Sequence, residues 1–97
     1  HEKKAYKLFL NAETYRKLKK YEAAIMYYRY VINDYPRSVW ADEARSGIGQ
    51  VYIKQKKFEQ ARDMFQIITN SNASEELKNN AAKKLIYIER RTSNRKR

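Results

Sequence analysis

Hydrophobic residues recur along this chain at spacings of three and four, the period of an α-helix with one buried face. Four apolar residues in the first part of the chain keep this spacing: Leu8, Ala12, Tyr15 and Leu18. No stretch of useful length alternates between apolar and polar residues, as a half-buried strand would. Strong helix breakers are limited to Pro36, Gly47 and Gly49. The pattern predicts an all-α chain of long helices and short turns.

Five helices are predicted from the start and stop signals between these apolar stretches. They cover about residues 3–19, 21–34, 38–56, 58–69 and 74–91. Pro36 ends the second helix, because proline cannot continue a helix and disfavours helical geometry at Tyr35. Ser38 and Ser74 stand where an N-cap hydroxyl can accept a free backbone N–H. Gly49 is interpreted as a packing residue at which another helix passes close by.

Two of these helices carry the same pattern at a distance of 37 residues. Tyr21, Ala24 and Tyr28 recur as Phe58, Ala61 and Phe65, each 37 positions later. A fixed period of this length indicates stacked helix hairpins. The matched positions predict one repeat over residues 3–36 and a second over 38–71. Ala81 follows Ala44 at the same distance, so residues 74–91 should cap the stack as the first helix of a third repeat.

The predicted core is the inward face of the second to fifth helices. It consists of Ala24, Ile25, Tyr28, Val31, Ile32, Ala41, Ala44, Ile48, Tyr52, Ala61, Phe65, Ile68, Leu77, Ala81, Leu85 and Ile88.

Charge adds a second feature, because 22 basic and 11 acidic residues give a net charge of +11. From Lys78 onward only Glu89 opposes the basic residues. A solvated lysine-rich surface and an anionic partner both explain such an excess. Residues 92–97 are polar and predicted to be a disordered tail. The basic residues of this end are Arg91, Arg95, Lys96 and Arg97.

The residue types required for most catalytic sites are scarce. The chain has no cysteine, and its one histidine is His1. Thiolate chemistry and a Ser–His pair are therefore excluded, and no metal site or cofactor is predicted. Residues 46–49 do not form a phosphate loop, because no strand precedes them. No run of 18 apolar residues predicts a membrane span. An enzyme acting on a small-molecule substrate is not predicted.

The repeated positions resemble the tetratricopeptide repeat. Its signature residues appear as Tyr15, Tyr21, Ala24, Tyr28 and Pro36 in the first copy, and as Gly49, Tyr52, Phe58, Ala61 and Phe65 in the second. The resemblance implies a right-handed superhelix of antiparallel helix hairpins. It also implies a non-catalytic scaffold that binds partner proteins.

Residues 31–44 carry a narrower resemblance, to the inter-repeat junction of BamD-type (YfiO-type) lipoproteins of the outer-membrane β-barrel assembly machinery. These residues read VINDYPRSVWADEA. The resemblance implies an accessory subunit at the periplasmic face of the outer membrane, bound to the periplasmic domains of a BamA-like barrel subunit. The lipidated cysteine of such proteins is absent from this chain, which starts at His1; we expect the leader and lipid anchor to have been removed. Tol–Pal-associated periplasmic adaptors share the junction, so they remain an alternative.

In tetratricopeptide proteins the first helix of each hairpin lines a concave groove. The resemblance assigns to this groove Tyr6, Phe9, Glu13, Arg16, Glu43, Ser46, Gln50, Lys54, Lys83, Tyr87 and Arg90. This amphipathic strip with a basic far end suits an acidic peptide segment, with the basic tail steering it. Tyr6 and Phe9 could instead only cover the N-terminal edge. Tyr27, Tyr30 and Tyr87, interleaved with basic residues, leave a less favoured nucleic-acid interpretation.

Overall fold

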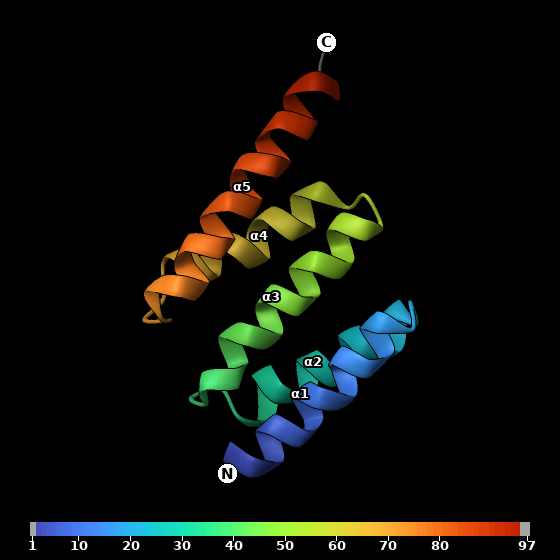
Figure 1. Ribbon diagram of the computed structural model, residues 1–97, viewed down its shortest axis with the longest axis vertical. Coiled ribbons are helices and arrows are strands. Elements are labelled where there is room, and N and C mark those ends of the chain that lie inside the picture. Colours follow the sequence, from blue (N-terminus) through green and yellow to red (C-terminus); the bar gives the residue numbers. More distant parts are fainter. Residues whose placement is uncertain (1, 96–97) are drawn as a thin grey trace.

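The computed structural model describes residues 2–95, with side chains as far as Ser93, and these residues form five α-helices (Figure 1). The helices are α1 (Glu2–Lys17), α2 (Tyr21–Asp34), α3 (Val39–Lys54), α4 (Phe58–Thr69) and α5 (Glu75–Arg95). No strand occurs within residues 2–95. The all-α prediction is confirmed, and α2 and α4 begin and end at the predicted residues.

The helices form two antiparallel hairpins, α1 with α2 and α3 with α4, and α5 packs against α4 (Figure 1). Both hairpins turn in the same way. Lys19 and Lys56, 37 residues apart, have φ angles of 62° and 61°. In each turn the next residue donates its N–H to a carbonyl five residues back: Lys20 to Tyr15 at 2.9 Å and Lys57 to Tyr52 at 2.8 Å. This is the Schellman ending of a helix, made here without glycine.

The repeated alanine and aromatic residues occupy the core, as predicted. Ala24 and Ala61 are fully buried, and so are Tyr28 and Phe65 to within 1% of their surface. A small residue lets two helices approach closely, and the ring one turn further along the same helix fills the neighbouring space. The hairpins are therefore held together by the positions that the sequence repeats.

Glycine allows the two closest helix contacts. A Cβ on Gly49 would lie 2.6 Å from Cζ of Phe65, on the facing helix of the same hairpin. Gly49 is therefore a packing residue, as the sequence analysis proposed. A Cβ on Gly47 would lie 2.3 Å from Cζ of Tyr28, which belongs to the preceding hairpin. Gly47 thus serves the contact between repeats, a role that sequence analysis did not assign.

Several helix ends differ from the prediction. α1 ends at Lys17 rather than at residue 19, so Leu18 enters the turn and is 61% exposed instead of facing inward. α3 likewise ends at Lys54, two residues earlier than predicted, where the chain enters the equivalent turn. Ser38 precedes α3, but its hydroxyl donates to the carbonyl of Tyr35 at 2.9 Å and caps no helix N–H. Ser74 does cap α5, since its Oγ accepts the N–H of Leu77 at 3.2 Å.

The prediction of a disordered tail from residue 92 is wrong for residues 92–95, because α5 continues to Arg95. The hydroxyl of Thr92 donates to the carbonyl of Ile88 at 3.0 Å, and Arg62 of α4 reaches the same hydroxyl at 3.5 Å. These bonds anchor the last turns of a polar helix. Lys96 and Arg97 lie outside the described residues, as does the side chain of Arg95.

Candidate functional site

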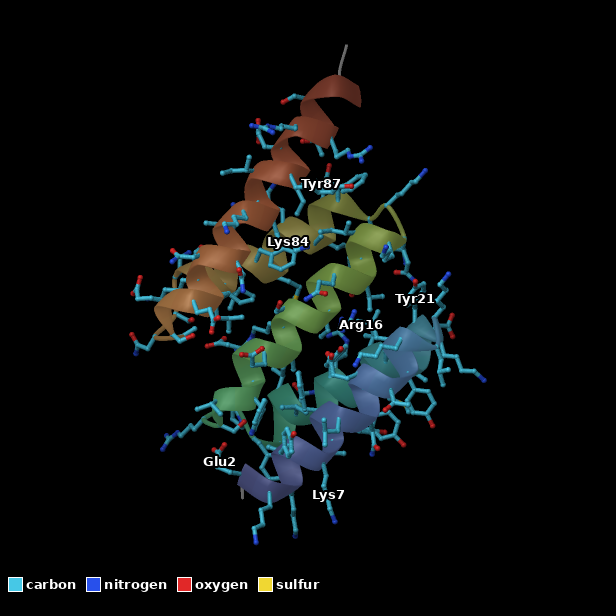
Figure 2. The ribbon with its side chains drawn as sticks, viewed as in Figure 1. Glu2, Lys7, Arg16, Tyr21, Lys84 and Tyr87 are labelled. Carbon is cyan, nitrogen blue, oxygen red and sulfur yellow. The ribbon has the colours of Figure 1, made fainter. Side chains whose placement is uncertain are left out.

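A concave hollow of about 1050 Å³ lies between α1, α3 and α5. These are the first helices of the two hairpins and the capping helix, as the resemblance implied. The lining residues are Arg16, Lys17, Lys19, Tyr21, Glu43, Ser46, Gln50, Ile53, Lys54, Leu77, Asn80, Lys83, Lys84 and Tyr87. Figure 2 shows Arg16, Lys84 and Tyr87 around this space. We refer to it as the groove.

The groove contains most, but not all, of the predicted residues. Seven of them line it: Arg16, Glu43, Ser46, Gln50, Lys54, Lys83 and Tyr87. Tyr6, Phe9, Glu13 and Arg90 are not among its lining residues. Arg90 is exposed on α5.

Tyr6 and Phe9 instead pack on Trp40 at the start of α3. Their ring centroids lie 4.6 Å and 5.1 Å from that of Trp40. Such distances are typical of paired aromatic rings. These side chains therefore join α1 to α3, although Tyr6 remains 41% exposed.

Glu13 lies beside the groove in a network that fixes Arg16. Nη2 of Arg16 donates to Oε1 of Glu13 at 2.8 Å, and Nε of Arg16 donates to the hydroxyl of Tyr28 at 3.1 Å. The Tyr28 hydroxyl donates in turn to Oε2 of Glu13. The network holds the guanidinium of Arg16 in one orientation at the groove wall.

All three groups of the network have shifted pKa values, and the hydrogen bond with Glu13 raises that of Arg16. Burial raises the pKa of Tyr28, and the neighbouring Glu13 carboxylate raises it further. Burial alone would raise the pKa of Glu13, but the hydrogen bonds from Arg16 and Tyr28 outweigh it and the pKa is lowered. Tyr28 therefore stays a neutral donor and Glu13 an ionised acceptor near neutral pH.

The groove carries an excess of unpaired positive charge. Five lysines line it: Lys17, Lys19, Lys54, Lys83 and Lys84. Among the described side chains the two ion pairs are Arg16–Glu13 and Arg45–Asp42, so none of these lysines has a carboxylate within 4.0 Å. Glu43 is the one acidic residue of the lining. An anionic ligand would therefore find cations that no internal partner occupies.

Seven of the residues that line the groove were not assigned to it by sequence analysis: Lys17, Lys19, Tyr21, Asn80, Lys84, Ile53 and Leu77. The first three surround the turn after α1, in which Lys19 has a left-handed backbone conformation. Lys84 directly follows the predicted Lys83, and Asn80 lies about one helical turn before Lys83. Their helical spacing on α5 was the signal that could have found them.

The groove offers binding chemistry built from ammonium, amide and aromatic groups. Within residues 2–95, no three His, Cys, Asp or Glu side chains are grouped so that they could hold a metal ion. None of the described helices is long and apolar enough to cross a bilayer.

The profile of a family described as Tetratricopeptide repeat matches residues 15–84, from α1 into α5. That range is nearly three-quarters of the 97 residues and includes both hairpin turns. The chain belongs to the tetratricopeptide repeat family. Tetratricopeptide repeats generally mediate protein–protein interactions and typically act as non-catalytic scaffolds. A search of curated proteins finds no match.

Proposed function

We propose that this tetratricopeptide protein is a non-catalytic scaffold that binds an acidic segment of a partner protein in the groove. The five unpaired lysines around the groove carry the proposal. Proteins arrange complementary charge across an interface to select and steer a partner. A partner segment rich in Asp and Glu supplies that complement.

The dimensions of the groove suit a short segment. On α3 its lining runs from Glu43 to Lys54, which at 1.5 Å per residue is roughly 16 Å. That length accommodates about three turns of helix or five extended residues. Each exposed ion pair with a lysine contributes about 0.2–1 kcal/mol, so several pairs give a moderate and salt-sensitive affinity.

A nucleic acid fits the groove less well. Tyr27 is stacked on Tyr15 at 5.4 Å and meets Tyr30 edge-on at 5.7 Å, and none of the three lines the groove. Of the tyrosines interleaved with basic residues, Tyr87 alone lines it. We therefore favour a polypeptide partner.

For the biological setting, we propose a BamD-type accessory subunit of the outer-membrane β-barrel assembly complex. The junction over residues 31–44 supports this assignment, and in the structure its Trp40 packs on Tyr6 and Phe9 to set the approach of α1 to α3. The partner would be the periplasmic domains of a BamA-like subunit. The protein would lie at the periplasmic face of the outer membrane, attached through an N-terminal lipid anchor. A Tol–Pal-associated adaptor remains the alternative, because it shares this junction.

Binding by the full chain can be measured by fluorescence anisotropy with three labelled ligands. These are a helical peptide of about 12 residues rich in Glu and Asp, its Gln and Asn counterpart, and a single-stranded RNA. We expect binding of the acidic peptide alone at near-physiological salt, with a tenfold or greater loss in Lys54→Glu/Lys83→Glu. Lys4→Glu/Lys7→Glu is the matched control, because both lysines are exposed on α1 and neither lines the groove. Figure 2 shows Lys7 pointing away from it. Equal losses in both variants, or preferential RNA binding, would refute the proposal.

The biological setting needs a separate experiment. A tagged chromosomal copy should fractionate with the outer membrane and co-purify with the barrel-forming subunit. Co-purification with Tol–Pal components instead would select the alternative, and a protein found outside the envelope would exclude both.

A further inference from the structure

The one carboxylate of the groove lining lies away from three of its five lysines. Lys54 lies at the C-terminal end of α3, and Lys17 and Lys19 lie at and beyond the C-terminal end of α1. Glu43 lies in the second turn of α3, about 16 Å from Lys54 along the helix axis. Three of the five groove lysines therefore lie at one end and the single carboxylate of the lining lies toward the other, while Lys83 and Lys84 lie on α5.

Glu43 is a half-buried carboxylate that forms no ion pair within the described part of the chain. No Lys or Arg side chain in that part lies within 4.0 Å of it. The charged groups that face it are all acidic: Glu13 from α1, Glu76 from α5 and Asp42 from its own helix. Glu13 and Asp42 are already paired with arginines. Burial raises the pKa of Glu43, and these three carboxylates raise it further.

The position of Glu43 is continuous with the rest of the concave surface. Glu43 and Leu77 line both the groove and an adjoining hollow of about 480 Å³. That second hollow lies between the α2–α3 turn and the α4–α5 loop, where Pro36 and Ala73 form its walls. A segment that starts among the lysines and follows α3 therefore passes over Glu43.

We propose that the groove is directional, and that its occupant carries a Lys or Arg against Glu43 and acidic residues against the Lys54 end. This inference rests on the proposed binding of an acidic segment. A partner that covers Glu43 removes water from a carboxylate, which is unfavourable unless the partner supplies a cation. Glu43 thus acts as a specificity-determining residue: it disfavours uniformly acidic segments and selects those with one basic residue about three helical turns from the acidic block.

The test compares two helical peptides of about 16 residues that carry the same block of glutamates at one end. The first has an arginine about eleven residues from that block, to match the spacing along α3, and the second has glutamine there. For the full wild-type chain we expect the arginine peptide to bind about threefold more tightly, the effect of one partly exposed ion pair. Glu43→Gln should bring the two affinities within about 1.5-fold. Glu59→Gln, an exposed carboxylate on α4, is the matched control and should leave the preference intact.

Direction is read separately, from a nitroxide label beside the arginine. It should broaden the amide signals around Glu43 more than those around Lys54. If both peptides bind equally well to the wild type, or the label broadens both ends alike, the directional proposal is wrong while acidic-segment binding stands. If neither peptide binds, the proposed function is wrong as well.

Discussion

Replacing Gly47 with alanine should destabilise the fold through Tyr28, across the contact between the first and second hairpins. The added Cβ would lie 2.3 Å from Cζ and 2.6 Å from the hydroxyl oxygen of Tyr28. The Tyr28 side chain is fully buried, so its ring has no free space to move into. Its hydroxyl is bonded to Glu13 and Arg16, so a displaced ring also loses these partners.

Three contributions decide the size of the effect. Alanine is favoured over glycine inside a helix by about 1 kcal/mol. Overpacking of a well-filled core costs about 1–3 kcal/mol. Loss of the hydrogen bonds that Tyr28 makes with charged groups costs about 1.5–3 kcal/mol. The net destabilisation is therefore about 1.5–5 kcal/mol, which lowers Tm by at least about 6 °C in a domain of this size.

Urea and thermal unfolding followed by circular dichroism can test this prediction in a double-mutant cycle with Tyr28→Leu. Without the ring, Gly47→Ala should lose most of its cost, because the clash disappears and the helix-propensity gain remains. Equal costs of Gly47→Ala in both backgrounds would refute the mechanism, as would a single mutant as stable as the wild type.

Three further changes can be followed by urea unfolding from pH 3 to 8. Glu13→Gln should lower stability by about 1–2 kcal/mol at pH 7, an effect lost as pH falls through the lowered pKa of Glu13; equal stability at pH 7 would contradict its role. Glu43→Gln should raise stability at pH 7 by less than about 1 kcal/mol, and this gain should disappear in acid, because protonation removes the repulsion in the wild type. Lys56→Gly should add about 0.5–1 kcal/mol at every pH, since its φ of 61° suits glycine; destabilisation would contradict this.

Much of the fold could be predicted because the repeat pattern is local and amphipathic. Ala24 and Ala61 pair with Tyr28 and Phe65 in two copies, so one copy supports the interpretation of the other. Groove positions on α3 followed from the resemblance to the tetratricopeptide repeat, as Glu43 and the residues toward Lys54 show.

The remaining features depend on how the helices stack. The packing of Tyr6 on Trp40 and the contact of Gly47 with Tyr28 arise between elements far apart in sequence, for which spacing carries no signal. Lys19 itself adopts the left-handed backbone conformation of its turn, and lysine rarely adopts this conformation. The polar residues after Arg91 suggested disorder, but α5 continues to Arg95, and the Thr92 hydroxyl is hydrogen-bonded to Ile88 and Arg62.

The most direct measurement of groove binding is a titration of the isotope-labelled full chain with an acidic peptide, followed by amide chemical shifts. The largest shifts should map to the lining residues of α1, α3 and α5, including Gln50, Lys54 and Lys83. Exposed residues on the second helices, such as Met26 on α2 and Ile67 on α4, should change little. Shifts concentrated on α2 and α4, with none in the groove, would contradict a scaffold that binds its partner there.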